Sequence, residues 1–326
     1  MKSRRRVVIA LVTFALPLPG LAQQAAKRYR IGFLAAEAPS DPPQARRLEA
    51  LRSALRELGY AEGRDIVIDE RWANGQYDRL PSLASELVAL KVSVMVTSGT
   101  KATVAARNAT ATIPIVMGGT GDPIGLGLTT DLARPSTNVT GTTNFGPELG
   151  PKLLEALKEV APRIAHVAYL VNPADRPTTL PGMQSAARSL NLELRLFEVS
   201  APGQFDGAFG EVAKARCDAV VVQGDTLFEV NLPAVARLAL KHRLASASSI
   251  SEFAEAGGLI TYGPDRLQGY RRAAVFVDRL LKGAQPAELP IERPTKFERV
   301  INLRTAAALG LSIGQPLLLR ADRLIE

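Results

Sequence analysis

A half-domain pattern that occurs twice constrains the fold of this chain more than any other feature. The sequence GQYD at residues 75–78 returns as GQFD at residues 203–206. An alternating apolar run precedes each copy, at residues 66–72 and 192–197. An amphipathic stretch follows each copy, and then an apolar run that stops at glycine. Four matching residues are weak support alone, but the same order of elements around both copies indicates an internal duplication. Two α/β units predict two lobes with a cleft between them.

Stretches with the spacing of strands alternate with stretches that have the spacing of helices. Leucines recur at helical intervals from Leu48 to Leu58, and a run of alternating apolar residues follows at residues 66–72. Such alternation predicts parallel sheets with helices on both faces. We therefore expect an α/β fold with two Rossmann-like lobes, each built on a parallel sheet, joined by three crossings.

Three short extended segments are predicted to cross between the lobes, at residues 138–144, 259–262 and 297–301. Leucine spacing predicts a helix at residues 267–281, which returns the chain to the first lobe. The expected division places lobe 1 at residues 28–143 plus 263–296, and lobe 2 at residues 144–262 plus 297–326.

The N-terminus has the pattern of a signal peptide. Four basic residues among positions 2–6 precede an apolar run at residues 7–18, and Gly20 and Ala22 are small residues of the kind that a signal peptidase reads. The apolar run is too short to span a bilayer comfortably, which argues against a membrane anchor. We predict a signal peptide at residues 1–22, cleavage near Ala22 and a mature protein in the periplasm.

The charge of the chain gives no support to a nucleic-acid partner. The formal charge of +8 comes from 40 basic and 32 acidic residues, and four of the basic ones lie in the predicted signal peptide. The remaining basic residues are scattered rather than gathered in one block, whereas a nucleic-acid interface requires a basic patch. Cys217 is the only cysteine, so an intrachain disulfide is excluded.

The residue types that most enzymes need are scarce. His166 and His242 are the only histidines, and the sequence has no G-x-S-x-G elbow, P-loop or H-E-x-x-H motif. One cysteine and two histidines do not make a zinc site, although a site of oxygen ligands alone stays open. The glycine-rich residues 118–127 lack dinucleotide-loop spacing, because Thr130 stands where a third glycine or alanine is expected. We predict no enzyme activity, no cofactor and no metal, and we interpret residues 118–127 as a bend close to a bound molecule.

Small polar residues at strand ends are the candidates for ligand binding, because ligands of open α/β sheets lie at the carboxyl ends of the strands. Ser98, Gly99 and Thr100 follow a strand and open a helix, where backbone N–H groups can hold an anion such as a carboxylate. Asp225 and Thr226 occupy the equivalent place in the second half, and Asp225 can pair with a ligand ammonium. Five further candidates lie at other strand ends or crossings: Asp122, Thr143, Asn144, Asn172 and Ser248. The alternative is that these residues only cap helices and make turns.

Several ordered motifs resemble those of a known family. They include IPIV at residues 113–116 followed by DPIG at 122–125, NVTG at 138–141, EAGGL at 255–259 and PTKFE at 294–298. On these residues the chain resembles, over nearly its whole mature length, the ABC transporter substrate-binding proteins, which include tryptophan- and tyrosine-type binding proteins. The resemblance implies a type I periplasmic-binding-protein fold and a small ligand, such as an amino acid, held between two lobes by hinge closure. It also implies delivery to an ABC permease in the inner membrane, and we expect a monomer.

Two other functions compete with transport. A periplasmic receptor of the same fold would pass the ligand signal to a sensory partner, and a neighbouring sensor-kinase gene rather than permease and ATPase genes would favour that function. A secreted hydrolase is motivated only by the cleft. Loss of turnover with retained binding after replacement of Asp122 or Asp225 would support a hydrolase.

Overall fold

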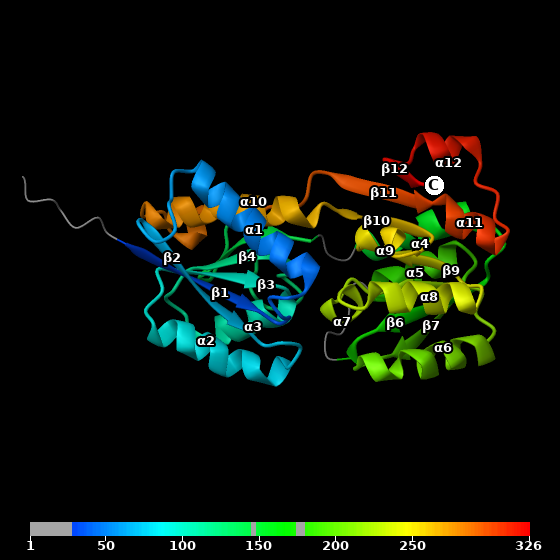
Figure 1. Cartoon of the computed structure of the whole chain (residues 1–326), viewed down its shortest axis with the longest axis horizontal. Helices are drawn as coiled ribbons and strands as arrows, with labels where there is room; N and C mark the ends of the chain where they lie inside the picture. Colours follow the sequence, from blue (N-terminus) through cyan, green and yellow to red (C-terminus); the bar gives the residue numbers. More distant parts are fainter. Residues whose placement is uncertain (1–27, 145–147, 174–179) are drawn as a thin grey trace, which may run out of the picture.

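The protein is described from a computed structural model that covers residues 28–144, 148–173 and 180–326. The predicted signal peptide, residues 1–22, lies outside the described residues. Two β-sheets with their covering helices lie side by side along the longest axis of the molecule (Figure 1). We call the part around the five-stranded sheet lobe 1 and the part around the seven-stranded sheet lobe 2. No helix of the described residues has the length and apolar character needed to cross a membrane.

The sheet of lobe 1 is entirely parallel and has the strand order β2-β1-β3-β4-β5. Its strands are β1 (Tyr29–Ala35), β2 (Ile66–Trp72), β3 (Val94–Ser98), β4 (Ile115–Thr120) and β5 (Val139–Thr143). Its helices are α1 (Pro42–Glu57), η1 (Tyr77–Arg79), α2 (Leu80–Ala89), α3 (Thr100–Ala109), α10 (Arg266–Leu281) and η4 (Pro286–Glu288).

Strand alternation explains how these helices divide between the two faces of the sheet. Ile31 and Phe33 of β1 pack in a buried cluster with residues of α1 and α10, whereas Leu34 packs with α2 and α3 on the other side. Successive side chains of a strand point to opposite faces, so a strand covered on both faces is rich in apolar residues. All of β3 and β4 is buried, and both begin with apolar residues and end with the buried polar residues Thr97, Ser98 and Thr120.

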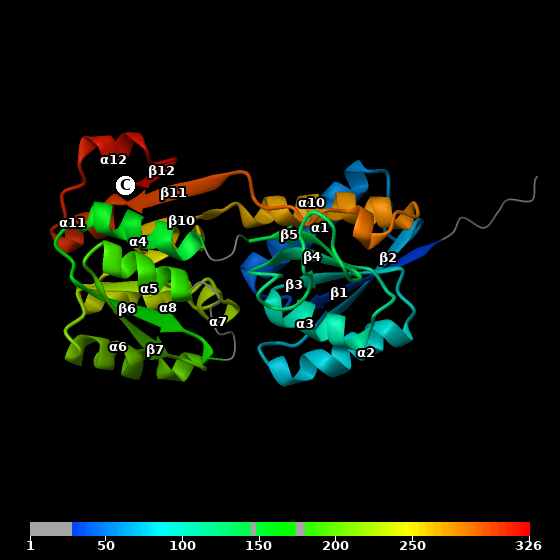
Figure 2. The ribbon, with the colours of Figure 1, turned by 180° about the vertical axis from the view of Figure 1, so that it is seen from behind.

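The sheet of lobe 2 has the order β12-β11-β10-β9-β8-β6-β7, and every pair is parallel except β10 with β11. Its strands are β6 (His166–Val171), β7 (Glu193–Glu198), β8 (Ala219–Val222), β9 (Ala245–Ser248), β10 (Ile260–Pro264), β11 (Phe297–Asn302) and β12 (Arg323–Ile325). Its helices are α4 (Leu149–Val160), α5 (Leu180–Ser189), η3 (Pro202–Gln204), α6 (Phe205–Lys214), α7 (Thr226–Glu229), α8 (Leu232–Lys241), α9 (Glu252–Glu255), α11 (Leu303–Leu309) and α12 (Gln315–Leu319). Helices α4 and α5 contribute to one buried cluster and α6 and α8 to another, so the sheet is covered on both faces (Figure 2).

The two lobes repeat one strand order. The order β2-β1-β3-β4 of lobe 1 matches the order β7-β6-β8-β9 of lobe 2, strand for strand along the chain. The GQYD segment leads through η1 into α2, and the GQFD segment leads from η3 into α6. The duplicated motif therefore marks the same point of both lobes, between the second strand and the helix after it.

The crossings differ in part from the sequence prediction. Residues 139–143 form β5, an edge strand that pairs with β4, so the chain leaves lobe 1 after this segment rather than within it. The predicted crossings at residues 259–262 and 297–301 lie in β10 and β11, which pair antiparallel from Ile260 with Ile301 to Pro264 with Phe297. Between these strands the chain enters α10 and η4, which pack against lobe 1.

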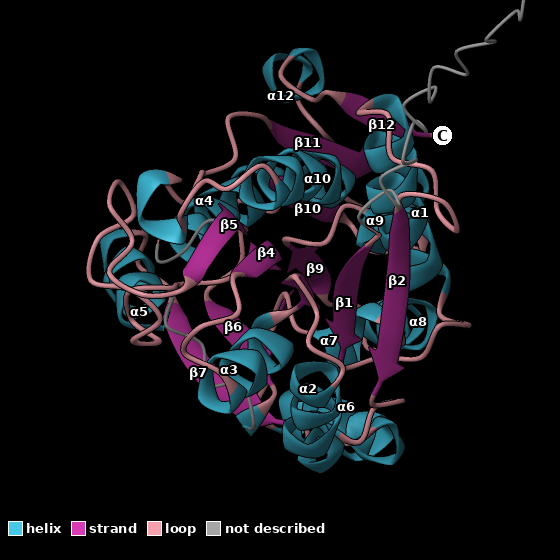
Figure 3. Ribbon diagram, turned by 90° about the vertical axis from the view of Figure 1, so that its left-hand side faces the viewer, coloured by secondary structure: helices cyan, strands magenta, loops and turns pink. Residues whose placement is uncertain are grey.

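Several short elements were missed, among them β9, β12, α7 and α9. They have four or fewer residues each, which is too short for a periodic apolar pattern. Figure 3 views the molecule along its long axis, with α10 above β4 and β5. The contacts of α10 with α1, β4 and β5 agree with this view.

Candidate functional site

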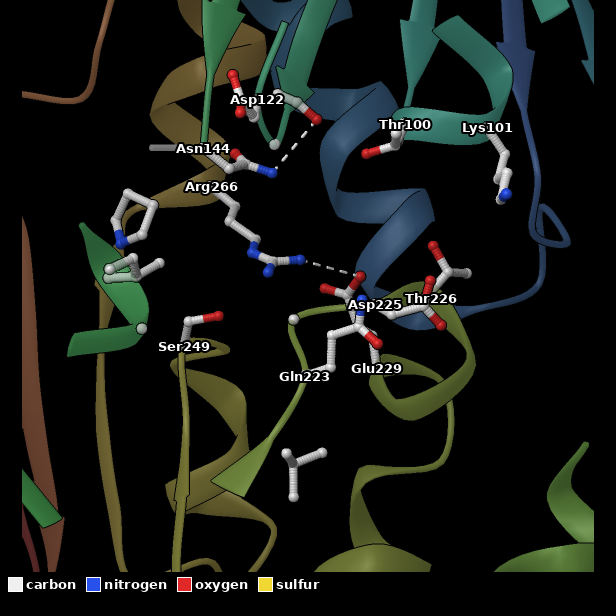
Figure 4. Close-up of a pocket in the computed structure, with 18 of the residues that line it drawn as sticks. Thr100, Lys101, Asp122, Asn144, Gln223, Asp225, Thr226, Glu229, Ser249 and Arg266 are labelled. Atoms are coloured by element: carbon white, nitrogen blue, oxygen red, sulfur yellow. Dashed lines mark hydrogen bonds and ion pairs between the residues drawn. The ribbon is translucent and has the colours of Figure 1, made fainter. Parts of the chain in front are cut away.

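A cavity of about 140 Å³ lies between the lobes, at the carboxyl ends of both sets of parallel strands. Lobe 1 contributes loops that follow β1, β3, β4 and β5, and lobe 2 contributes the loops that follow β8 and β9. The segment from β10 into α10 completes the lining. The polar and charged residues labelled in Figure 4 are Thr100, Lys101, Asp122, Asn144, Gln223, Asp225, Thr226, Glu229, Ser249 and Arg266. The cavity therefore lies at the strand ends where the sequence analysis expects a ligand.

Six of the ten predicted ligand residues line this cavity: Gly99, Thr100, Asp122, Asn144, Asp225 and Thr226. The two loops that the duplication aligned come together across the cleft. A Cβ atom placed on Gly99 of lobe 1 would lie 3.8 Å from the hydroxyl oxygen of Thr226 of lobe 2. The loop after β3 therefore faces the loop after β8, as the alignment of the two halves implied.

Four predicted residues do not line the cavity: Ser98, Thr143, Asn172 and Ser248. Ser98 and Ser248 are the last residues of their strands, and both are fully buried in the sheet. The Ser98 hydroxyl lies 2.8 Å from Gln44 Oε1 and 2.7 Å from the Tyr270 hydroxyl. Because side chains alternate along a strand, the residue after each strand turns into the cavity instead. Ser249, which the sequence analysis missed, therefore takes the place expected of Ser248.

Asp225 is both a helix cap and a cavity residue. Its Oδ1 accepts hydrogen bonds from the backbone N–H of Leu227 at 2.9 Å and from Asn172 Nδ2 at 3.0 Å. Burial raises the pKa of Asp225 above its ordinary value, and these hydrogen bonds oppose that change. Asn172 thus contacts Asp225 without lining the cavity itself. Asp225 caps α7 and also lines the cavity, so the capping role and a place at the cavity are compatible.

A buried ion pair joins the lobes beside the cavity. Arg47 of α1 in lobe 1 pairs with Glu229 of α7 in lobe 2, and their side chains are 7% and 1% exposed. Burial alone would raise the pKa of Glu229, but the charges of Arg47 and Arg266 hold it below its ordinary value. The pair cannot form unless the lobes are together, so the structure represents a closed cleft.

A second buried carboxyl lies close to this pair. Glu37 follows β1, is 2% exposed and shares a hydrogen bond with Thr226 across the cleft. Burial raises its pKa from 4.5 to about 7, although Thr226 and Arg47 act in the opposite direction. Its Oε2 atom has no hydrogen-bond partner among the described residues. Burial in the closed cleft therefore favours the protonated form of Glu37.

The glycine-rich end of β4 allows close packing at the cavity edge. Gly118 and Gly119 belong to the strand, and the pairing with β5 shifts register between Gly118 and Thr120. A Cβ atom on Gly118 would lie 2.5 Å from the ring of Tyr270, which α10 places against the strand. The predicted bend is therefore a strand irregularity, and Gly121 and Asp122 after it reach the cavity.

Lobe 2 gives the cavity an apolar wall. Side chains from α4, β6, α5, β8 and the end of β10 form it, namely Leu149, Leu153, Tyr169, Met183, Val221 and Pro264. The cavity is thus amphipathic, which suits a small ligand with a polar head and an apolar body. Within residues 28–144, 148–173 and 180–326, no group of three or more His, Cys, Asp or Glu side chains is placed to hold a metal ion.

Comparison with known proteins agrees with this architecture. The model of a family described as ABC transporter substrate binding protein matches residues 40–325. The tyrosine-binding protein of Clostridioides difficile (strain R20291) is 26% identical over 261 residues, which are 79% of this chain and 74% of that protein.

Two solved structures have the same fold. One is an ABC domain in complex with L-Trp from Streptococcus pneumonia, with a TM-score of 0.84, 24% identity and coverage of 92% of this chain and 100% of that one. The other is a conserved domain protein from Vibrio cholerae, with a TM-score of 0.84, 23% identity and coverage of 91% and 99%. The chain has a type I periplasmic-binding-protein fold, and the predicted fold class is confirmed.

Proposed function

Because the chain belongs to the ABC transporter substrate-binding protein family, we propose that it captures an amino acid, or a similar small molecule, in the cavity between its lobes. Proteins of this family bind small ligands outside the cytoplasm and deliver them to ABC permeases. The chain is accordingly the solute-binding component of an importer, and its family and structural relatives are solute-binding proteins rather than enzymes.

The observation that carries the proposal is the amphipathic cavity lined by both lobes. Thr100 and Asp122 belong to lobe 1, whereas Asp225, Tyr169 and Met183 belong to lobe 2. A ligand that contacts both sides binds the closed state better than the open state, and this difference in affinity drives closure. The names of the relatives support an amino acid, since one is a tyrosine-binding protein and another contains L-Trp.

Several features of the protein belong to the same proposal. We propose a monomer in the periplasm, released from a signal peptide cleaved near Ala22. Lobe 1 would comprise residues 28–143 plus 263–296, and lobe 2 residues 144–262 plus 297–326. No observation favours the signalling receptor considered above, so transport stands as the single proposed role.

Ligand screening tests the proposal directly. Thermal unfolding of the purified protein would be followed with each of the twenty L-amino acids, together with mass spectrometry of small molecules that copurify. A ligand at one hundred times its Kd stabilises the folded state by about 2.7 kcal/mol, so at least one amino acid should raise Tm clearly. No stabilisation by any amino acid, and no amino acid among the copurified molecules, would refute the amino-acid assignment.

A pair of threonine variants tests whether the ligand binds in the cavity or elsewhere on lobe 1. Thr100→Ala removes a cavity hydroxyl and should weaken ligand binding while leaving Tm of the free protein nearly unchanged. Thr112→Ala alters an exposed threonine after α3 and should change neither quantity. Equal effects of both variants on ligand affinity would place the ligand elsewhere.

A further inference from the structure

Arg266 enters the cavity with hydrogen-bond donors to spare. It is the first residue of α10, directly after the helix cap Asp265, and its side chain is 12% exposed. Its Nη1 lies 3.4 Å from Glu229 Oε2, and its Nε is buried without a partner among the described residues. A guanidinium has five N–H donors, and a buried donor that stays unpaired costs free energy. Figure 4 shows this side chain extending between Asn144 and Ser249.

Arg266 shares its carboxylate partner with a second arginine. Glu229 is the buried carboxylate between two arginines, and Arg47 binds its Oε1 while Arg266 lies near its Oε2. One carboxylate therefore serves two guanidinium groups. Glu37 offers only partial compensation near neutral pH, since its pKa is about 7. Arg266 therefore shares its carboxylate partner and keeps N–H donors free at the cavity wall, and an anion that accepts from these donors would offset the cost of their burial.

A glycine brings a second donor to the same place. A Cβ atom on Gly224 would lie 2.5 Å from Ser249 Oγ and 3.0 Å from Arg266 Nη2. The missing side chain lets the hydroxyl and the guanidinium converge over the backbone at the end of β8. All three residues line the cavity. Gly224 thus creates a small cradle with two donors from separate loops of the structure.

We propose that this cradle holds the carboxylate of the ligand, with Arg266 as the charged donor and Ser249 as the second donor. The assignment rests on the proposed function and specifies which end of the ligand lies where. Charge-assisted, two-donor contacts are the strong ones, and arginine is suited to carboxylates by its fork of N–H groups. The apolar wall near Tyr169 and Met183 of lobe 2 lines the same cavity and can receive the body of the ligand.

This position differs from the carboxylate site expected from the sequence at residues 98–100. Ser98 cannot serve there, because its hydroxyl is buried and bonded to Gln44 and Tyr270. Gly99 and Thr100 remain at the cavity wall, where they can contact another polar group of the ligand. Asp122 and Asp225 are the cavity carboxylates available to an ammonium group.

Titration calorimetry with ligand fragments tests the assignment. The probes form two series: L-tryptophan, tryptamine and indole-3-propionate, and L-leucine, isoamylamine and 4-methylpentanoate. Each amine lacks the carboxylate, and each acid lacks the ammonium. For Arg266→Gln we expect the affinity for the bound amino acid and its matching acid to fall roughly 10- to 100-fold, with little change for the matching amine.

Conservative and control variants sharpen the result. Arg266→Lys keeps the charge but loses the fork, so it should recover only part of the lost affinity. Ser249→Ala should weaken binding of the acids a few-fold, and Arg271→Gln, which alters an exposed arginine of the same helix, should leave every affinity unchanged. Unfolding temperatures of the free variants establish that each one folds.

Two results overturn the assignment in different ways. If the wild type binds an amino acid and Arg266→Gln binds it equally well, or loses the amine as strongly as the amino acid, the carboxylate lies elsewhere and the proposed function survives. If the wild type binds no amino acid of these series or of the twenty screened, the proposed amino-acid ligand and this carboxylate assignment fall together.

Discussion

Protonation of Glu37 should couple closure of the cleft to pH. In the closed structure this carboxyl is 2% exposed, shares a hydrogen bond with Thr226 of the opposite lobe and has a pKa raised by burial to about 7. When the lobes separate, water reaches the carboxyl and its pKa moves back toward 4.5. Closure therefore takes up a proton between these two pH values, and the Glu37→Gln variant removes this dependence.

The magnitude follows from the two pKa values. The interval from 4.5 to about 7 is a factor of roughly 300 in proton affinity, or ~3 kcal/mol of closure free energy. This is an upper limit, because lobe 1 alone buries part of Glu37 in the open state. The raised pKa means that the contribution is fully present below pH 4.5 and is lost as pH rises through about 7. Ligand affinity should thus fall roughly 10- to 100-fold from pH 5 to pH 8.5.

The assay is titration calorimetry at half-unit steps from pH 5 to pH 8.5, with the amino acid that gives the largest thermal stabilisation. The carboxylate and ammonium of a free amino acid keep their charges over most of this range. Glu37→Gln should flatten most of the dependence, whereas Glu57→Gln, which alters an exposed glutamate of α1, should leave it intact. Asp225, whose pKa is also raised by burial, should contribute a slope of the same sign.

Two results would refute the reasoning. One is an affinity that rises with pH in the wild type, and the other is an equal slope in the wild type and in Glu37→Gln. Neither histidine lines the cavity in which ligand affinity is measured. His166 is the first residue of β6, at the amino ends of the strands of lobe 2, whereas the cavity lies at their carboxyl ends. His242 stacks on Phe209 of α6.

Three further predictions concern single contacts. Arg47→Met leaves Glu229 without its main partner in the closed state, so X-ray scattering profiles should shift toward an open, longer molecule and the free energy of ligand binding should weaken by about 3 kcal/mol. The double variant with Glu229→Leu should recover much of that loss. A compact Arg47→Met protein with full ligand affinity would contradict the argument. Gly224→Ala forces a methyl group against Ser249 and Arg266 and should weaken ligand binding, whereas Gly203→Ala, at a site with open space, should not. Phe209→Ala empties a fully buried position of lobe 2 and should lower the free energy of unfolding by about 3–5 kcal/mol in chemical denaturation, with a small effect on ligand affinity; a loss below 1 kcal/mol would contradict its place in the core.

Much of the fold can be predicted from the chain because apolar periodicity is a local property. The strands from β1 to β4 and from β6 to β8 carry apolar runs or alternate apolar with polar residues, and the repeated GQYD and GQFD segments align the two halves. Elements such as α7 and β9, with four residues each, depend on tertiary contacts and leave no period to detect. Residues 138–144 were misread as a crossing because an edge strand and a linker look alike in sequence.

The site was predictable only where it follows strand ends. The rule that ligands lie beyond the carboxyl ends of strands singled out Thr100, Asp122 and Asp225, which line the cavity, and Ser248, whose neighbour Ser249 lines it instead. Applied to the end of β10, the same rule would have found Arg266 as well. Arg47 and Glu229 lie within helices of different lobes, and their pairing depends on closure, which no local pattern of the sequence encodes.

The antiparallel pairing of β10 with β11 has a mechanical consequence. Two of the three connections between the lobes leave lobe 2 as neighbouring strands tied by backbone hydrogen bonds. Such a two-stranded ribbon resists sliding and separation of its strands, but it bends and twists easily across its thin direction. We therefore expect these two connections to bend together when the lobes move, rather than as independent tethers. A permease that recognises the closed protein would then meet one relative arrangement of the two lobes.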